Sequence, residues 1–382
     1  MHFTVNSRGI SSLVVVVMVG ALLATGRSCM LRLTSISRSR IRGCSWAECS
    51  TCCSELSSVL TKFRPTAEPN LVCFDVQFFI RTRQHYTVLT SFAPHFSFYL
   101  RMAQDFLLDA GSNVKLSHKI VWRLEDNSTI QSPLVLAMIE AGVAVVAHSI
   151  EVTESVPPSF TTWVPNFHFI EKRGFSVVAR RLSTRHVPYT ERKRQVIWAG
   201  STTGVPCYDI APCVSSCNEL DRVKLVRYFS TKNITWLNLR LSNAVQWCHG
   251  SAAALRDEGL LRDHVQEDEW AKYRGVLDID GNVDSWGLRW RLESGSVVFL
   301  VKSSYEHFFS NSLVDGTHYV GIDANFDNLK EKTTIVYSQE VEDVKYLENV
   351  ANNAKLLMRE LSYQKVTSAV ARALLTDEGR KE

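Results

Sequence analysis

Two segments of the chain carry small hydroxyl or amide side chains directly after apolar runs. The first is IWAGSTTG, residues 197–204, in which an apolar run is followed directly by Gly200, Ser201 and Thr202. In an α/β sheet, ligands bind beyond the carboxyl ends of the strands, and small residues let backbone amides approach phosphate oxygens. A glycine and serine turn is also common in loops that bind nothing. From this segment alone, phosphate binding and a structural turn both remain open.

The second segment spans residues 273–309 and reads as strand, turn, helix, turn and strand. We expect Asn282 and Ser285 to lie beside the start of the helix. Unpaired amides and the helix dipole favour an anion there, so the arrangement suits a diphosphate. An ordinary βαβ unit needs the same turns and is the alternative interpretation.

The spacing of apolar residues predicts the elements that would position these segments. Apolar runs bounded by turns predict strands over 71–80, 118–124, 196–200, 275–281, 296–301 and 318–322. Apolar residues at helical spacing predict helices over 98–110 and 285–295, and a long amphipathic helical region over 342–375. Strands that alternate with helices in this way are typical of an α/β fold.

Composition divides the chain into five parts. In chain order they are a targeting segment at 1–26, a Cys-, Ser- and Arg-rich stem or disulfide-pinned lobe at 27–70, a first α/β domain at 71–190, a second at 191–340 and a helical region at 341–382. We place the boundary between the two α/β domains at the basic polar stretch 180–194, which contains Pro188.

The N-terminal segment predicts entry into the secretory pathway. Arg8 precedes the apolar run 10–24, and Ala24 and Gly26 supply the small residues that signal peptidase needs. The run is shorter than the roughly 20 residues that span a bilayer comfortably. A cleaved signal is therefore favoured, and a type II membrane anchor stays open.

Ten cysteines fit the same compartment, because an even set can pair under oxidising conditions. They are Cys29, Cys44, Cys49, Cys52, Cys53, Cys73, Cys207, Cys213, Cys217 and Cys248. The cluster at 44–53 has zinc binding as its alternative, but no histidine lies nearby at finger spacing. Disulfides of undetermined connectivity are favoured.

Charge and hydropathy exclude several classes of protein. The formal net charge of +4 is too small for a nucleic-acid footprint. A single hydrophobic segment argues against a transporter. No GxGxxG opens a helix after the first strand, which ranks a sugar-nucleotide dehydrogenase last.

Taken in order, the motifs resemble glycosyltransferase family ninety, the family of Rumi-like protein O-glucosyltransferases. The likeness covers roughly residues 120–360 and is clearest over 196–330. The matching residues are Trp198, Gly200, Ser201, Tyr273, Asp278, Asp280, Gly281, Asn282, Ser294, Gly295, Ser296, Tyr305, His318 and Tyr319.

The resemblance implies a GT-B-like fold, with two Rossmann-like domains facing a cleft. It implies an inverting, metal-independent transferase of the ER or Golgi lumen, without a prosthetic group. The enzyme would move glucose, xylose or a related sugar from a UDP-sugar co-substrate to a hydroxyl on a protein or glycan. Residues 71–190 would face the acceptor and residues 191–340 would bind the donor. The donor-binding residues would include Gly200, Ser201, Thr202, Asn282 and Ser285.

An inverting transferase also needs a carboxylate that removes the proton of the acceptor hydroxyl. The family places an Asp at the end of a strand of the first domain, and the similar strand here is HKIVWRLED. The resemblance therefore points to Asp126, with Glu125 as the neighbour that could replace it. Asn127 begins a glycosylation sequon, and a glycan there would block the cleft. An ordinary exposed turn carboxylate is the alternative role for Asp126.

Two arginines of the family pattern are missing here, since Ala199 and Gly287 stand in their places. The diphosphate charge would then fall to Arg289 and Arg291 one helical turn further on, with Arg291 preferred, or to Arg222 and Lys224 after the first turn. A solvated helix face is the alternative for both pairs. His307 replaces an acidic residue, which leaves the sugar open. These departures motivate a second hypothesis, an inactive relative that serves as a binding module in the lumen.

Overall fold

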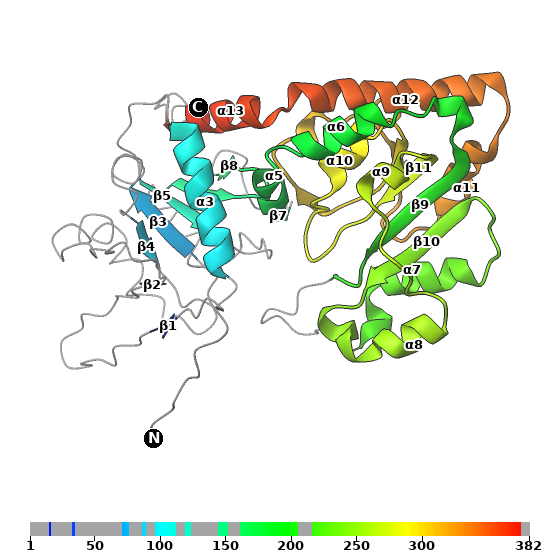
Figure 1. Ribbon diagram of the computed structural model, residues 1–382, viewed down its shortest axis with the longest axis horizontal. Helices are drawn as coiled ribbons and strands as arrows, with labels where there is room; N and C mark the ends of the chain where they lie inside the picture. The colour runs from blue at the N-terminus through cyan, green and yellow to red at the C-terminus, as the bar shows by residue number, and fades with distance from the viewer. Residues whose placement is uncertain are drawn as a thin grey trace. The chain divides into compact units, whose positions relative to one another are not determined.

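The computed structural model describes residues 15–16, 33–34, 71–75, 86–88, 96–111, 119–123, 144–151, 161–204 and 216–375. Contacts along the chain divide it into two compact units, one of residues 1–124 and 133–145 and one of residues 125–132 and 146–382. The expected α/β class is confirmed, because helices alternate with a parallel sheet in the second unit (Figure 1).

The first five strands of the chain, all in the first unit, form antiparallel pairs with one another. Strands β1 (Val15–Val16) and β2 (Leu33–Thr34) form one pair. Strand β3 (Leu71–Asp75) lies between β4 (Tyr86–Val88) and β5 (Lys119–Arg123). A Rossmann-like half implies parallel pairing, and β3 to β5 differ from it. The ten residues 76–85 between β3 and β4 are fewer than the dozen or so that a parallel crossover needs.

Helix α3 (Phe96–Gly111) confirms the helix expected over 98–110. Its buried side chains recur three and four residues apart, which is the spacing of one helix face. They are Leu100, Met102, Ala103, Phe106 and Leu107. The predicted strand over 118–124 is likewise present as β5.

The second unit is built on a five-stranded parallel sheet in the order β10-β9-β11-β12-β14. The strands are β9 (Lys193–Ser201), β10 (Leu237–Asn243), β11 (Tyr273–Asp278), β12 (Val297–Val301) and β14 (Val320–Ile322). The chain runs from β9 outward to β10 and then crosses back to β11 on the other side. The order therefore reverses between β9 and β11, where open α/β sheets bind ligands.

Near-continuous apolar runs explain why these strands occupy the centre of a parallel sheet. Val196 to Trp198, Val276 to Leu277 and Val297 to Phe299 are buried almost completely. A parallel strand covered on both faces has such runs instead of an alternating pattern. The sequence positions of these strands were predicted for the same reason.

The remaining elements are further strands, and helices that connect or cover the strands. They are β6 (Ala144–Ala147), β7 (Ile150–Glu151), β8 (Thr161–Trp163), α5 (Phe167–Glu171), α6 (Ser176–Thr184), η2 (Tyr189–Glu191), η3 (Cys217–Glu219), α7 (Asp221–Ser230), η4 (Gln246–Ser251), α8 (Ala252–Asp257), α9 (Glu267–Trp270), α10 (Leu288–Glu293), β13 (Tyr305–Glu306), η5 (Ser310–Ser312), α11 (Leu329–Thr334), η6 (Ile335–Tyr337), α12 (Val341–Glu360) and α13 (Tyr363–Leu375).

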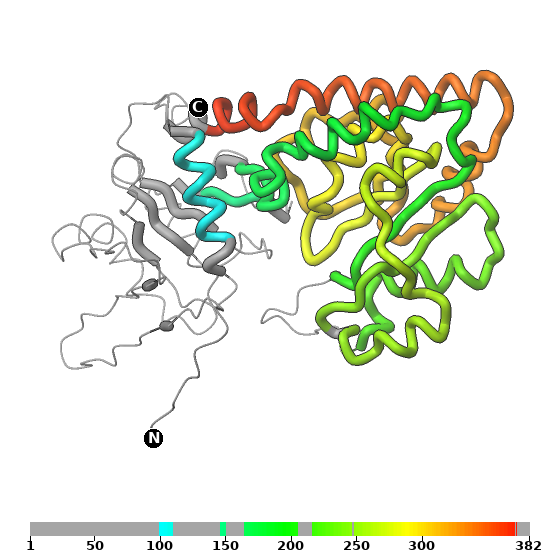
Figure 2. Tube along the Cα trace, in the orientation of Figure 1, coloured from blue at the N-terminus to red at the C-terminus, as the bar shows by residue number. Residues whose placement is uncertain are grey.

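Helices α6 and α12 both pack against α10 (Figure 2). Leu288 and Leu292 of α10 share a core cluster with Ala354 and Met358 of α12. Helix α6 is joined to α9 by the ion pairs Arg181–Glu267 and Arg185–Asp268. Both α6 and α12 therefore belong to the second unit. The expected domain boundary at 180–194 and the separate helical region from 341 stay predictions.

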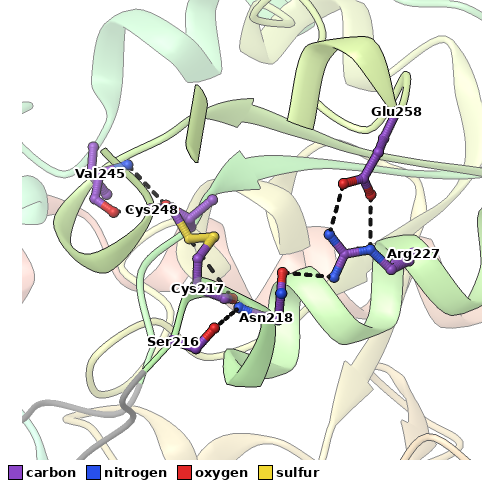
Figure 3. Close-up of a disulfide and its surroundings, with 8 residues drawn as sticks. Ser216, Cys217, Asn218, Arg227, Val245, Cys248 and Glu258 are labelled. Atoms are coloured by element: carbon purple, nitrogen blue, oxygen red, sulfur yellow. Dashed lines mark hydrogen bonds and ion pairs between the residues drawn. A yellow bond between two sulfur atoms is a disulfide. The ribbon is translucent and has the colours of Figure 1, made fainter. Parts of the chain in front are cut away.

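A disulfide joins Cys217 in η3 to Cys248 in η4 (Figure 3). It fixes the segment before α7 to the segment after β10. The expected disulfide chemistry is present at this pair. The cluster at 44–53 and the targeting segment, apart from β1, lie outside the described residues. Among the helices that the structure describes, none is long and apolar enough to cross a membrane.

Candidate functional site

The loops that follow β9 and β11 meet at the point where the strand order reverses. The backbone N–H of Gly204, in the first loop, donates to Asn282 Oδ1 in the second at 3.2 Å. Ser201 is the last residue of β9 and Asn282 lies in the second loop, so these two expected residues lie beside loops that are joined by a hydrogen bond. Their place at the carboxyl ends of central strands is the usual ligand position in an open α/β sheet.

Gly200 allows the close packing of Trp198 beneath the first loop. A Cβ atom at position 200 would lie 2.5 Å from the indole ring of Trp198, which is buried. No other residue type fits there without moving the indole. The glycine of the motif thus has a packing role, and its expected role near a ligand stays a prediction.

Thr202 stabilises the loops through its side chain. Its hydroxyl donates to the carbonyl of Val245 at 2.9 Å and accepts from the Val245 N–H at 2.8 Å. Its own N–H donates to the carbonyl of Asn243 at 3.0 Å. These partners lie at the end of β10 and directly after it, so Thr202 anchors the first loop to that end of β10.

The buried residues Ser285 and Asp278 form a polar cluster with the partly buried Arg291 beside these loops. The Ser285 hydroxyl donates to Asp278 Oδ1 at 3.0 Å and accepts from Arg291 Nη1 at 2.6 Å. Arg291 Nη1 also forms an ion pair with Asp278 Oδ1. Arg291 and Ser285 are thus brought together as expected, with part of the arginine charge already met by a carboxylate.

The guanidinium of Arg291 is held between two indoles. Its carbon Cζ lies 5.0 Å from the ring centre of Trp270 and 5.3 Å from that of Trp290. Among the described residues, the buried Nε of Arg291 has no hydrogen-bond partner. A buried donor without a partner costs free energy unless a ligand or water satisfies it, which makes Arg291 the strongest ligand candidate of the set.

Arg291 also fills the space beside Gly287, where the family pattern carries an arginine. A Cβ atom at position 287 would lie 2.9 Å from Arg291 Cζ. The guanidinium therefore occupies the place where a side chain at 287 would begin. Arg291, one helical turn after position 287, therefore places its positive charge where the family pattern has an arginine.

Arg289 is not brought into this cluster. It forms a buried ion pair with Glu293, and its Nη2 donates to the carbonyl of Met358 at 2.6 Å. These contacts direct it to α12, where it links two helices of the core. A donor-binding role for Arg289 has no support in this arrangement.

Sequence reasoning matched Asp280 to the motif but gave it no role. Its Oδ2 accepts a hydrogen bond from the Ser303 hydroxyl at 2.6 Å, which connects the ends of β11 and β12. Burial raises the pKa of the Asp280 carboxyl from 3.8 to about 7. Perturbed carboxyls of this kind cluster at functional sites. The position directly after a central strand was the signal that could have identified it.

The expected base and its surroundings lie outside the described residues, which include neither Glu125, Asp126 nor Asn127. No group of three or more His, Cys, Asp or Glu residues that could hold a metal ion is found within the described part of the chain.

The geometry defines a parallel α/β domain with a polar site at its switch point. A family comparison then identifies the chain: it belongs to glycosyl transferase family 90, whose model matches residues 154–375, more than half of its length. The matched region contains every described residue of the candidate site. The resemblance drawn from the motifs is confirmed.

Individual relatives are more distant. Protein O-glucosyltransferase 2 of Danio rerio is 31% identical over 114 residues, which cover 30% of this chain and 21% of that protein. The chain thus matches about a fifth of that relative's length.

Two solved structures also show a weak likeness. The GtfA/B complex has 11% identity and a TM-score of 0.35, and the match covers 66% of this chain and 56% of that one. The pneumococcal O-GlcNAc transferase GtfA in complex with UDP and GlcNAc has 12% identity and a TM-score of 0.27, over 73% and 58%. TM-scores this low do not establish a shared fold.

Proposed function

We propose that the chain is an inverting glycosyltransferase that uses a UDP-sugar. It transfers glucose, xylose or a related sugar to a hydroxyl of a protein or glycan in the lumen of the ER or Golgi. The observation that carries this proposal is the cluster of Ser285 and Arg291 beside the joined loops of Ser201 and Asn282, at the switch point of a family 90 chain.

The cluster suits the diphosphate of the donor. Hydroxyls at the ends of central strands and an arginine with a buried, unpartnered Nε are groups that bind phosphate oxygens. Because Asp278 meets part of its charge, Arg291 acts chiefly as an oriented hydrogen-bond donor. The proposal needs no metal, which follows the family expectation.

The chemical step is a single displacement at the anomeric carbon. The acceptor oxygen attacks from the face opposite the diphosphate, and a carboxylate, Asp126 or Glu125, takes its proton. The bond between the sugar and the diphosphate breaks, and UDP leaves with the electron pair. Hydrogen bonds from Ser285 and Arg291 stabilise the negative charge that grows on UDP.

Titration calorimetry with UDP in the presence of EDTA tests the donor site. We expect saturable binding by the wild type, and binding about ten- to a hundredfold weaker after Arg291→Ala, because a hydrogen bond to a charged group contributes about 1.5–3 kcal/mol. Ser201→Trp should block the site by volume. Arg262→Ala, which alters an exposed arginine that is bonded to Gly259, should bind as the wild type does.

An inactive relative that binds without turnover is the second candidate. The ion pair between Arg291 and Asp278 favours it, because an arginine already paired with a carboxylate attracts a diphosphate less strongly. Product formation from UDP-glucose or UDP-xylose distinguishes the two hypotheses. Loss of that turnover in Asp126→Asn, with UDP binding retained, would support the active enzyme. UDP binding by a wild type that turns over neither sugar would favour the binding module.

A further inference from the structure

Arg222, the second residue of α7, contacts both loops of the candidate site. Its Nε donates to the carbonyl of Asp280 at 2.7 Å, and its Nη2 donates to the carbonyl of Ile279 at 2.8 Å. Its Nη1 donates to the carbonyl of Ser201 at 3.1 Å and to the Thr203 hydroxyl at 2.6 Å. One buried guanidinium therefore bonds to four acceptors on two loops.

These two loops are the ones that flank the switch point of the sheet. Ser201 is the last residue of β9 and Thr203 lies in the loop after it, whereas Ile279 and Asp280 follow β11. The planar fork of an arginine presents its donors in a fixed arrangement, so it sets the spacing of the acceptors that it binds. Lysine has one flexible ammonium group and cannot reproduce that arrangement.

The packing around the guanidinium of Arg222 leaves it little room to move. It lies over the buried indole of Trp198, with Cζ 5.5 Å from the ring centre. A Cβ atom at Gly281 would lie 3.0 Å from the Thr203 hydroxyl and 3.3 Å from Arg222 Nη2. The two loops thus approach each other closely at Gly281, next to the guanidinium of Arg222.

We propose that Arg222 is a positioning residue that holds the two donor loops at the spacing the donor requires. It acts through the backbone of the loops. Sequence reasoning had offered Arg222 as a direct source of charge for the diphosphate. The link to the donor rests on the proposed function, whereas the clamping of the loops does not.

Hydrogen exchange of the full chain without ligand tests the clamp directly. In Arg222→Gln we expect the amides of 201–204 and 279–283 to exchange at least about tenfold faster, because local opening of both loops becomes easier. Arg222→Lys should show a similar increase in these two segments. The matched control is Arg227→Gln on the same helix, whose arginine pairs with Glu258 away from the loops (Figure 3). Unchanged exchange in both Arg222 variants would overturn the proposal.

Chemical rescue separates positioning from a general loss of stability. Arg222→Ala should bind UDP at least about tenfold more weakly. Millimolar guanidinium ion, far below denaturing concentrations, should restore most of that affinity by filling the vacated position. It should not restore UDP binding in Arg291→Ala, and it should not change UDP binding in Arg227→Gln. Weakened binding without rescue, together with a wild-type exchange pattern in Arg222→Lys, would contradict the proposal.

The two proposals fail in different ways. If the wild type binds no UDP, the donor assignment fails, and the exchange experiment still decides whether Arg222 clamps the loops. If the wild type binds UDP but the Arg222 variants bind it equally well, only the positioning role fails. If Arg222→Ala does not fold, Arg222→Lys provides both measurements.

Discussion

Gly287 and Arg291 act as a pair at the scale of single residues, because the guanidinium lies against the glycine. The backbone at Gly287, with φ −92° and ψ −8°, suits alanine, so a methyl group there acts through contact and not through strain. We predict that Gly287→Ala displaces Arg291 from Asp278 and Ser285. UDP binding should weaken about three- to tenfold, as measured by calorimetry.

The control for this substitution is Gly250→Ala, because a Cβ atom there meets no heavy atom within 4 Å. It should leave the UDP affinity unchanged. Equal affinities for Gly287→Ala and the wild type would mean that Arg291 has room to move or takes no part in binding.

Asp280 predicts a pH dependence of stability. Burial raises the pKa of this carboxyl to about 7 in the folded chain, against 3.8 when it is exposed. Between these values the folded state holds a proton that the unfolded state has lost, so the free energy of unfolding falls as pH rises. From pH 5 to 7 this carboxyl should lower the stability of the wild type by about 2 kcal/mol.

Asp280→Asn should flatten that part of the profile, which urea unfolding at pH 5, 6 and 7 measures. Asn retains an oxygen that accepts from Ser303, so the loop contact survives. Asp263→Asn, at an exposed position, should leave the profile as it is. A wild-type slope in Asp280→Asn would show that another group determines the pH dependence.

At the scale of elements, the sequence predicted the central strands well because strands buried on both faces have unmistakable apolar runs. It could not separate Arg289 from Arg291. Residues that are two positions apart in the sequence lie about 200° apart around a helix. Arg291 therefore faces the loops, whereas Arg289 faces α12. The sequence also offered Arg222 as a charge for the diphosphate and missed its bonds to the loops, because the acceptors at 279 and 280 lie far along the chain and no local sequence pattern indicates them.

The disulfide between Cys217 and Cys248 ties the start of α7 to the end of β10. The two cysteines are 31 residues apart, and closing a loop of that length restricts the conformations of the unfolded chain. We predict that removing the disulfide lowers the free energy of unfolding by about 2–4 kcal/mol. Urea unfolding of the Cys217→Ala/Cys248→Ala variant measures this cost. Reductant should destabilise the wild type by a similar amount and the double variant far less. Equal stability of the two proteins without reductant would contradict the prediction.

At the scale of the whole molecule, the contacts described above for the two loops of the candidate site all lie within residues 146–382. The disulfide and the helices that cover the sheet lie there as well. We predict that a chain of residues 146–382 folds and binds UDP within about threefold of the full chain. It should transfer no sugar, because Asp126 and Glu125 are absent from it. Circular dichroism and calorimetry check the first part, and a UDP-sugar turnover assay checks the second.

The contacts of Arg222 have a consequence for how relatives of this chain diverge. Three of its four loop acceptors are main-chain carbonyls, which every amino acid possesses. Substitutions in the loops therefore leave those bonds intact, and the side chains that face a ligand are free to change over evolution. The arginine and the close approach at Gly281 have no such freedom. An invariant support beneath variable loops would let one scaffold acquire new sugar preferences without rebuilding its sheet.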